Sequence, residues 1–541
     1  MAWDHNRSRN RIAHFMTTVP QASIDVRTFD QTYLTQRISE ARARGKRLGL
    51  DEAPIFAVPR NRAILVDGVH VYAQLLDYHD QIQEQGHETE ASHKRVLQFL
   101  HLHYSATDRV VEEFEAQRVD YHGPRLHAVL VTPTGDERQR VLRAVAFAVT
   151  LKETIEAAGR DFGGSRLRTR VRIGIDTGRA VAVSSGRGAD LDPLFLGSPA
   201  NHAAKLAEGD QPGIYLSDRA RKILNEPTVG WACERSTALA QDRQYRHAND
   251  AYGQAQSGYD PSPTRARVQA AVRALKSDLD LSALTSPEAT FHFRRHEPPL
   301  RTIDFAELMP SRSIRMALGS VFADLSGFTA YVDTCILTGR IAEMTANLHV
   351  IRGELAACAR DDFAAKKIRF IGDCLHALIA IGTRTATEPV ATIDAAVMLT
   401  GGLRSSFDLC RGMLPGLDAM GIAIGAEYGE TPLSRIGIRG ERSVRCASSK
   451  AVSASEALQS DLTGRQTALG PVALVNASVA VRSRFGRGPV EDLDHARAER
   501  LVSPVRSTSP IKPTAISSGL LISGGAAAAG AVRERGSGRH A

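Results

Sequence analysis

The 541-residue chain has few cysteines, few aromatic residues and no long apolar run, and each shortage excludes a class of protein. The six cysteines are scattered, without a Cys-x-x-Cys pair or a His-rich companion, so neither a zinc site nor a disulfide framework is indicated. The longest weakly apolar stretch, residues 519–532, is too short and too rich in glycine and alanine to span a bilayer, and no targeting segment is readable. We therefore expect a cytoplasmic protein with reduced thiols and no membrane partner.

Basic residues outnumber acidic residues by only eight, 68 against 60, and the excess lies at the two ends of the chain. Residues 1–62 carry a net charge of +5 and residues 505–541 carry +4, which leaves the body between them close to neutral. A neutral body is poorly suited to following a phosphate backbone, so we expect no nucleic-acid partner. The composition, 43% hydrophobic and 24% charged, is that of a globular protein rather than a fibrous or wholly disordered one.

Shifts in composition divide the chain into five predicted segments. They are a basic N-terminal arm at 1–55, a first α/β domain at 56–235, a helical connector at 236–310, a second α/β domain at 311–504 and a disordered basic tail at 505–541. Within the arm, residues 28–47 are helical in character and end in a basic cluster that we interpret as a solvated face: Arg42, Arg44, Lys46 and Arg47. Within the connector we expect one or two helices, one of them marked by a helical stripe of apolar residues: Val268, Ala271, Val272 and Leu275.

The two α/β segments repeat one pattern, which indicates an internal duplication. Each begins with an apolar strand that ends in an aspartate, Asp67 in the first segment and Asp324 in the second. Each continues through a helix into a hairpin that contains Gly-x-x-Leu-His-Ala, at residues 121–128 and 370–377, and then into a central strand and a further helix. We therefore expect two copies of one domain.

Asp324 and Asp373 have the chemistry of a metal site. Asp324 ends a strand just before a helix whose first-turn amides can hold phosphate, and Asp373 lies in a tight turn that can bring a second carboxylate beside the first. Two hard oxygen ligands suit Mg²⁺ or Mn²⁺, and two such ions can stabilise the attacking and leaving oxygens of an in-line displacement. The alternative is that Asp324 is a helix N-cap and Asp373 is a turn former.

Residues 322–329, Phe-Ala-Asp-Leu-Ser-Gly-Phe-Thr, and residues 371–373, Ile-Gly-Asp, resemble the two metal-binding signatures of the class III nucleotidyl cyclases, the adenylate and guanylate cyclase catalytic family. The resemblance covers both α/β segments. It implies an α/β (α+β, ferredoxin-like) cyclase fold in which the tandem domains form an intramolecular pseudo-dimer. In that family the active site lies between two domains. One supplies the metal aspartates, and the other supplies base-reading residues and an Asn-x-x-x-Arg pair that holds the ribose and the transition-state phosphate.

The second domain matches the metal-supplying partner. The resemblance implies that Asp324, Asp373 and the carbonyl of Leu325 bind two divalent ions, Mn²⁺ or Mg²⁺. It also implies that the turn that follows binds the substrate, through Ser326, Gly327, Phe328 and Thr329. The other half-site of this domain is degenerate, because the aligned Asn and Arg positions fall on Arg445 and Ser449 and the aligned base-reading positions fall on Arg369 and Ile438.

The first domain matches the complementary partner. Asn201 and Lys205 occupy the Asn-x-x-x-Arg positions, which implies catalytic roles for both, although a lysine lacks the planar fork of an arginine. Asp120 and Leu194 occupy the base-reading positions. Pro124 replaces the second metal aspartate, which leaves Asp67 as a relic or an N-cap. We therefore expect one productive site per chain and a second, degenerate site that mirrors it.

The base-reading positions match neither purine pattern of the family, which is a Lys with an Asp or Thr for adenine and a Glu with a Cys for guanine. Asp120 can accept a hydrogen bond from uracil N3–H, from the cytosine amine or from the adenine amine, so this residue alone leaves the base open. Leu194 would help to fill the pocket beside a smaller base. Tandem unequal domains without an attached sensor or membrane module resemble the pyrimidine cyclases of bacterial Pycsar anti-phage systems, whose cyclic nucleotide acts on a separate effector protein.

We interpret the chain as a metal-dependent nucleotidyl cyclase, a phosphorus–oxygen lyase that converts a nucleoside triphosphate, UTP by preference, to cyclic UMP and pyrophosphate. The product would serve as a second messenger in anti-phage defence. The alternatives are an adenylate or cytidylate cyclase and a catalytically dead cyclase-like module that binds a nucleotide. The sequence leaves open whether the chain is a monomer or a homodimer.

Overall fold

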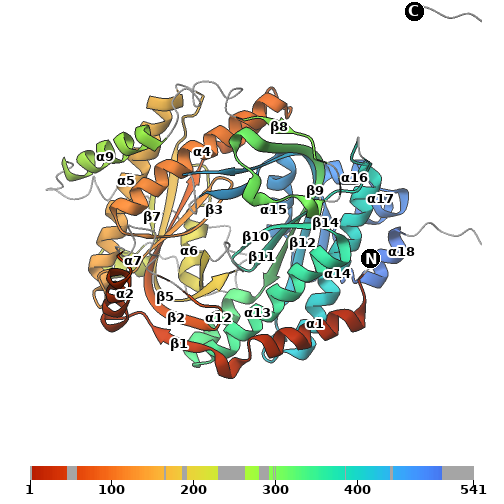
Figure 1. Cartoon of the computed structure of the whole chain (residues 1–541), viewed down its shortest axis with the longest axis horizontal. Helices are drawn as coiled ribbons and strands as arrows, with labels where there is room; N and C mark the ends of the chain where they lie inside the picture. Colours follow the sequence, from red (N-terminus) through yellow and green to blue (C-terminus); the bar gives the residue numbers. More distant parts are fainter. Residues whose placement is uncertain are drawn as a thin grey trace, which may run out of the picture. The chain divides into compact units, whose positions relative to one another are not determined.

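The computed structural model contains two β-sheets, each packed against helices (Figure 1). Both belong to one compact unit, Met1–Val502. The structure describes residues 3–45, 56, 58–163, 166–185, 192–228, 262–278, 291–296, 298, 300–383, 386–438 and 443–502. The predicted tail and most of the predicted connector lie outside these ranges. Among the helices in these ranges, none combines the length and the apolarity that crossing a membrane requires.

The first sheet has seven strands in the described residues, with β3-β4-β2-β5-β6 in order, β1 beside β2 and β7 beside β5. Its strands are β1 (Asp25–Thr28), β2 (Arg62–Leu75), β3 (Gln117–His122), β4 (Arg125–Leu130), β5 (Val171–Ser185), β6 (Asp192–Leu196) and β7 (Gly213–Leu216). The helices that follow these strands are α3 (Tyr78–Ile82), α4 (Glu90–Glu113), α5 (Glu137–Gly163), α6 (Ser198–Leu206) and α7 (Asp218–Leu224).

The second sheet has eight strands in the described residues, with β10-β11-β9-β12-β14-β15 in order, β8 beside β9 and β13 beside β12. Its strands are β8 (Phe293–Arg294), β9 (Ser313–Ser326), β10 (Lys366–Ile371), β11 (Cys374–Ile379), β12 (Gly421–Ile436), β13 (Val444–Ala447), β14 (Gln466–Leu469) and β15 (Val490–Glu491). Its helices are α12 (Phe328–Leu337), α13 (Ile341–Ala357), α14 (Pro389–Met413), α15 (Lys450–Ser460), α16 (Pro471–Asn476), α17 (Val479–Phe485) and α18 (His495–Val502).

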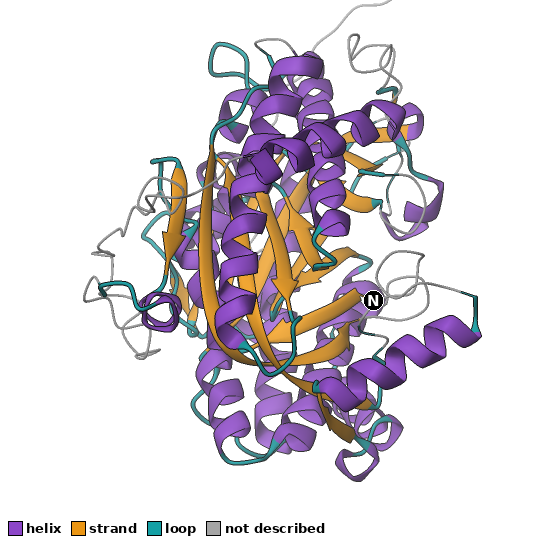
Figure 2. Cartoon of the chain, turned by 90° about the vertical axis from the view of Figure 1, so that its left-hand side faces the viewer, coloured by secondary structure: helices purple, strands orange, loops and turns teal. Residues whose placement is uncertain are grey.

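The two sheets repeat one topology, because β3-β4-β2-β5 in the first corresponds to β10-β11-β9-β12 in the second. In each, a strand and a helical segment lead to a hairpin, a long helix and a second central strand. The long strands lie among helices in Figure 2, and the buried apolar residues of α4 and α5 pack on the first sheet as those of α13 and α14 pack on the second. The predicted mixed helix-and-sheet class with a ferredoxin-like repeat is confirmed.

The N-terminal segment contacts both halves of this unit. Helix α1 (His5–Thr18) packs on α13 and α14, with Ile12 fully buried (Figure 1). Arg11 donates to the carboxylates of Glu354 and Asp362, so part of the basic charge of this segment is used inside the fold. Strand β1 then pairs in parallel with β2. The sequence pattern alone did not predict this packing.

Helix α2 (Gln31–Ala43) confirms a helix within residues 28–47. Its Tyr33, Arg37 and Ala41 are buried, and Tyr33 shares an apolar cluster with strands of the first sheet. One side of this helix is therefore part of the fold, while the predicted solvated face lies at its C-terminal end, where Lys46 and Arg47 fall outside the described residues. Arg42 and Arg44 on its other side are exposed.

The helix predicted in the connector is present as α9 (Ser262–Asp278), which packs on α4 and α5. The predicted stripe is its inner face, because Ala271, Val272 and Leu275 are buried and Val268 is partly buried.

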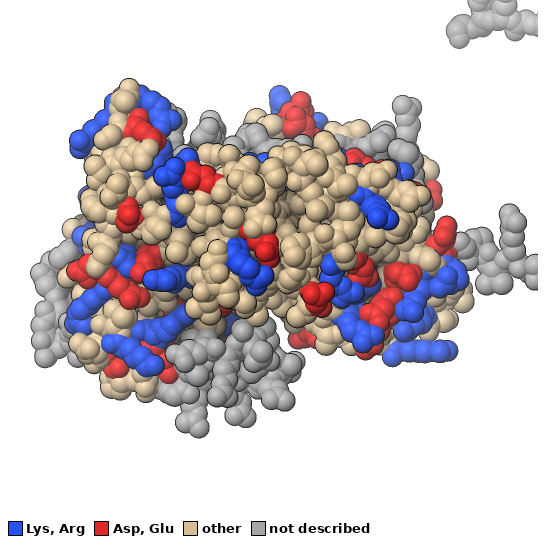
Figure 3. All heavy atoms as spheres, turned by 90° about the horizontal axis from the view of Figure 1, so that it is seen from below, with Lys and Arg blue, Asp and Glu red and all other residues tan. Residues whose placement is uncertain are grey.

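Elsewhere on the surface, basic and acidic side chains are interspersed over the face drawn in Figure 3.

Candidate active site

The turn after β9 presents Asp324 and then starts a helix at once. Gly327 has a φ of +86°, a left-handed conformation that glycine adopts without strain, and this reverses the chain into α12. Phe328 is buried and anchors the first turn of the helix. No side chain caps the N-terminus of α12, so its first-turn N–H groups are not taken up by a capping residue. Such a helix start favours phosphate.

The β10–β11 hairpin brings Asp373 to the same end of the sheet. Ile371 and Cys374 pair directly, so Gly372 and Asp373 form a two-residue turn. Strand β11 lies beside β9 with Leu375 opposite Ala323, which places the turn next to Asp324. The structure thus brings together the two aspartates that the sequence predicts as metal ligands.

Electrostatics show that the two carboxylates are close and poorly compensated. Burial raises the pKa of Asp324 to about 6. Burial and the charge of Asp324 together raise the pKa of Asp373 well above its ordinary range. Both residues keep intermediate solvent exposure, so solvent still reaches part of each. A divalent cation would supply the missing positive charge, and the donor set fits one.

The described residues contain no cluster of three or more His, Cys, Asp or Glu side chains that could hold a metal. The candidate site therefore provides two carboxylates, and any further ligands would be a backbone carbonyl such as that of Leu325 or oxygens of a bound triphosphate. Ser326 and Thr329 flank this turn and are partly exposed.

Helix α6 carries Asn201 and is held rigidly on the first sheet. It packs so closely on β5 that a Cβ at Gly174 would lie 2.1 Å from the carbonyl oxygen of Ala203. Next to Asn201, His202 is within 3.2 Å of the buried Asp176, which also accepts from Arg219. Burial alone would raise the pKa of Asp176, but the hydrogen bond with His202 and the charge of Arg219 lower it. This network fixes the orientation of α6.

The start of α6 lies against α12, the helix that follows the predicted metal turn. The backbone N–H of Ser198 donates to Asp333 on α12 at 3.0 Å. Leu194, on the strand before α6, is buried in the same apolar cluster as Leu325 and Phe328. The predicted base and ribose half is therefore adjacent to the predicted metal half. Asn201 and Lys205 lie further along α6, and their contact with substrate stays a prediction.

Lys205 lies one turn beyond Asn201 and affects a neighbouring acid. Burial raises the pKa of Glu208, and the positive charges of Arg125 and Lys205 oppose that rise. A cation is thus present on the helix where the family pattern has an arginine.

Asp120 reaches the same region from β3. Burial lowers the pKa of Arg352 to about 9, and the charges of Asp373 and Asp120 oppose this effect. Asp120 itself forms an ion pair with Arg369 of β10. The guanidinium of Arg352 lies 4.1 Å from the centre of the Phe370 ring. Sequence reasoning missed Arg352, because a single arginine on a helix carries no recognisable signature.

The alignment of Asp67 with Asp324 is wrong. His127 and His376 are equivalent hairpin residues, and they pair with Tyr72 and Phe322 respectively. Tyr72 and Phe322 are therefore equivalent, and two residues after them Gln74 corresponds to Asp324. Because Pro124 stands at the position of Asp373, the first half has neither metal aspartate.

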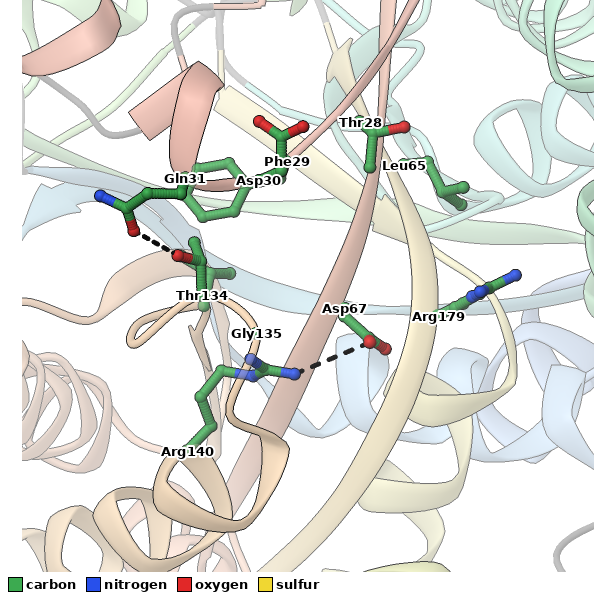
Figure 4. A pocket seen from close by; sticks show the side chains of 11 residues that line it. Thr28, Phe29, Asp30, Gln31, Leu65, Asp67, Thr134, Gly135, Arg140 and Arg179 are labelled. Atoms are coloured by element: carbon green, nitrogen blue, oxygen red, sulfur yellow. Dashed lines mark hydrogen bonds and ion pairs between the residues drawn. The ribbon is translucent and has the colours of Figure 1, made fainter. Parts of the chain in front are cut away.

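Asp67 instead lies seven residues earlier on the long strand β2 and lines a surface pocket of about 540 Å³. There it faces Arg140 at 3.7 Å (Figure 4).

The alignment of the second half-site is also wrong in three places. Phe195 lies opposite Ala182 in β5, and Ala447 lies opposite the equivalent Leu433 in β12. Helices α6 and α15 then begin at equivalent points. This register moves the counterparts of Leu194, Asn201 and Lys205 from Ile438, Arg445 and Ser449 to Cys446, Ser453 and Ala457.

The second site remains degenerate in this corrected register, because Gln74, Pro124, Ser453 and Ala457 supply neither metal ligands nor the Asn and Arg side chains. Its place is occupied by contacts between the two halves. Arg125 donates to Glu456 at 2.6 Å, and Tyr78 shares a 2.6 Å hydrogen bond with Ser448.

Comparisons with known proteins show the family of the chain. The model of the adenylate and guanylate cyclase catalytic domain matches residues 79–244. A curated protein of a Rhizobium species named uridylate cyclase is 49% identical over 511 residues, covering 93% of this chain and 96% of its own length. A second uridylate cyclase, from Pseudomonas aeruginosa, is 36% identical over 457 residues, covering 83% of this chain and 85% of its own length.

A solved structure extends the similarity to three dimensions. The crystal structure of a class III adenylyl cyclase-like ATP-binding protein from Pseudomonas aeruginosa matches with a TM-score of 0.74 and 32% identity, covering 93% of this chain and 100% of that chain. These relatives are at least 32% identical to the chain and each covers 83% of it or more. The chain therefore belongs to the class III nucleotidyl cyclases and is a nucleotidyl cyclase enzyme.

Proposed function

We propose that this enzyme is a uridylate cyclase that converts UTP to 3′,5′-cyclic UMP and pyrophosphate. The observation that carries the choice of base is the 49% identity to a uridylate cyclase over 93% of the chain. The residues at the two base-reading positions, Asp120 and Leu194, support this choice because together they match neither purine pattern. The reaction breaks the bond between the α-phosphorus and the bridging oxygen of pyrophosphate and forms a bond from the ribose 3′-oxygen to the α-phosphorus.

We propose that the two halves of the chain form a single productive site as an intramolecular pseudo-dimer. The support is the contact between α6 of the first half and α12 of the second, the helix that follows Asp324, where the N–H of Ser198 donates to Asp333. The mirror site lacks both carboxylates. One turnover site per chain follows, whether the chain is a monomer or a homodimer.

Asp324 and Asp373, with the Leu325 carbonyl, would hold divalent ions, Mg²⁺ or Mn²⁺. When bound, such ions lower the pKa of the ribose 3′-hydroxyl and neutralise charge on the triphosphate. The free N–H groups at the start of α12, after Gly327, orient the phosphates.

The other half acts on the ribose and the transition state. Asn201 hydrogen-bonds the ribose, and Lys205 stabilises negative charge on the reacting phosphate. Leu194 and the metal turn share a buried cluster that excludes water from one wall of the site.

Lys205→Ala should lower kcat with UTP by about 20-fold, because one transition-state cation is removed. Lys205→Arg should keep at least the wild-type kcat, because the guanidinium fork suits phosphate better than an ammonium. Steady-state rates at saturating UTP and Mn²⁺ measure both. Wild-type activity in the alanine variant would place Lys205 outside the site.

The decisive test of the function incubates the purified chain with each of the four ribonucleoside triphosphates and Mn²⁺ and identifies the products by mass. Cyclic UMP as the main product is expected. Cyclic product from another triphosphate alone would correct the base, and no cyclic product from any would refute a working cyclase.

Adenylate cyclase is the second candidate, and one observation favours it. The Pseudomonas aeruginosa structure that matches 93% of the chain is described as ATP-binding. The adenine amine can also donate to Asp120. The same assay with equimolar UTP and ATP separates the two functions by the ratio of products.

We further propose that the cyclic nucleotide is a second messenger in anti-phage defence that acts in the cytoplasm on a separate effector protein. The support is the resemblance to Pycsar cyclases together with the relatives' uridylate activity. Expression with and without the Asp373→Ala substitution, followed by infection and measurement of cyclic UMP, tests this role. A rise that depends on infection and on Asp373 is expected.

A further inference from the structure

The base-reading candidate Asp120 is held by a residue of the opposite half. Arg369 lies on β10, in the half that supplies the metal aspartates, and its Nη1 donates to Oδ1 of Asp120. The same nitrogen donates to the carbonyl of Tyr121 at 2.7 Å, and Nη2 donates to the carbonyl of Arg445. The guanidinium is thus fixed at three acceptors, one of which is the Asp120 carboxylate.

This pair is largely removed from solvent yet incompletely satisfied. The side chains of Arg369 and Asp120 are only 13% and 28% exposed. Within the described part of the chain, Oδ2 of Asp120 and Nε of Arg369 are buried and have no hydrogen-bond partner. Buried polar atoms are nearly always paired, so an acceptor left open next to a candidate site indicates that a ligand or water completes it.

The pair also lies at the site rather than elsewhere on the interface. Arg369 lies on β10, whose turn into β11 carries Asp373. On the other side, His122 of the strand that carries Asp120 places its ring 5.8 Å from that of Phe322, two residues before Asp324. The unpaired oxygen of Asp120 therefore lies in the part of the interface next to the two carboxylates that would hold the metal.

We propose that Arg369 is a positioning residue for base recognition, which fixes one oxygen of Asp120 so that the other accepts a hydrogen bond from the substrate base at a defined place. This inference rests on the proposed function. In an ion pair with arginine, Asp120 is a carboxylate and only accepts hydrogen bonds, so the base must donate, as uracil does through N3–H. A carboxylate fixed in advance selects one donor position, whereas a mobile one can follow the amines of cytosine or adenine as well.

The experiment compares kcat and KM of the full-length enzyme for all four ribonucleoside triphosphates with Mn²⁺. Arg369→Gln should raise KM for UTP about tenfold with a smaller change in kcat. The ratio of kcat/KM for UTP to that for CTP or ATP should fall at least fivefold. Arg369→Lys should recover part of that preference, because it keeps the charge but not the three-point attachment.

Two controls distinguish positioning from a structural role. Glu456→Gln breaks another ion pair between the halves, to Arg125, and should leave the order of preference among the four triphosphates unchanged. The double variant Asp120→Ala with Arg369→Gln should show the same preference as Asp120→Ala alone, because Arg369 acts through Asp120.

The inference is overturned if Arg369→Gln slows all four reactions equally with KM unchanged, or if Asp120→Ala keeps the wild-type preference. Failure of the proposed function gives a different result, which is a wild type that does not cyclise UTP. In that case equilibrium binding of the four triphosphates to wild type and Arg369→Gln still decides the matter: equal changes for every base refute the inference, and a loss confined to one base supports it.

Discussion

Asp373→Asn is expected to lower the rate of cyclic UMP formation by at least about 1,000-fold while the protein stays folded. The variant keeps the shape of the hairpin turn but removes one of two anionic ligands, and a neutral amide binds a divalent ion far more weakly than a carboxylate. A loss of this size corresponds to roughly 4 kcal/mol of transition-state stabilisation.

The same substitution should leave the metal-free protein at least as stable as the wild type at pH 7.5. Burial and Asp324 raise the pKa of Asp373, so the folded state binds its proton more tightly than the unfolded state does. The free energy of unfolding therefore falls as pH rises from the unfolded pKa of Asp373 through its folded pKa. The ionised pair of carboxylates thus destabilises the fold at neutral pH. Asparagine removes that repulsion.

Thermal melts with and without Mn²⁺ provide a measurement that is independent of turnover. Mn²⁺ should raise the melting temperature of the wild type and should leave that of Asp373→Asn unchanged. Asp67→Asn is the matched control, because it neutralises an aspartate that lines the surface pocket instead, and its rate and its response to Mn²⁺ should equal those of wild type. An active Asp373→Asn variant would place the metal site elsewhere.

The parts of the site that depend on local sequence were predictable. The turn at 324–329 and the hairpin around Asp373 are encoded by a few adjacent residues, and the structure brings their two carboxylates together. The helix of the connector was predictable for the same reason, since its apolar stripe has helical spacing.

Register across the duplication was not predictable from motifs. Strand β2 spans Arg62–Leu75, and either Asp67 or Gln74 can be read as the end of an apolar strand until the partner strand is known. Pairing of His127 with Tyr72 selects Gln74. Contacts between the halves, such as Arg369 with Asp120, arise from packing of surfaces more than 200 residues apart and leave no mark in the local pattern.

The corrected register strengthens the complementary interpretation of the two halves. Every position that would complete the mirror site is changed, including both metal positions, Gln74 and Pro124. In their place, the interface carries a salt bridge between Glu456 of α15 and Arg125 of β4. The region of the degenerate site now contributes contacts that hold the two halves together. The contribution of its salt bridge to the free energy of unfolding can be measured.

Glu456→Gln should lower the free energy of unfolding by about 2–3 kcal/mol at pH 7. Burial would raise the pKa of Glu456, but Arg125 and His122 outweigh it and lower the pKa from 4.5 to about 2. A carboxyl group with a depressed folded pKa stabilises the protein above its unfolded pKa, here by about 3 kcal/mol in full, and this contribution is lost as pH falls from 4.5 to 2. Arg125 is 43% exposed, so water can solvate it when the partner charge is removed, and the cost stays within this range.

Urea unfolding of wild type and Glu456→Gln at pH 7, 4 and 3 measures the effect and its pH dependence. The difference between the two proteins should be largest at pH 7 and should shrink progressively below pH 4.5. Glu491→Gln is the matched control, because its ion pair with Arg465 has both partners at least 60% exposed, and it should cost no more than about 0.5 kcal/mol at any of these pH values. If Glu456→Gln and Glu491→Gln cost the same, the salt bridge does not hold the halves together. The remaining contacts between the halves must then do so, among them the apolar cluster of Leu194, Leu325 and Phe328 and the hydrogen bond between Ser198 and Asp333.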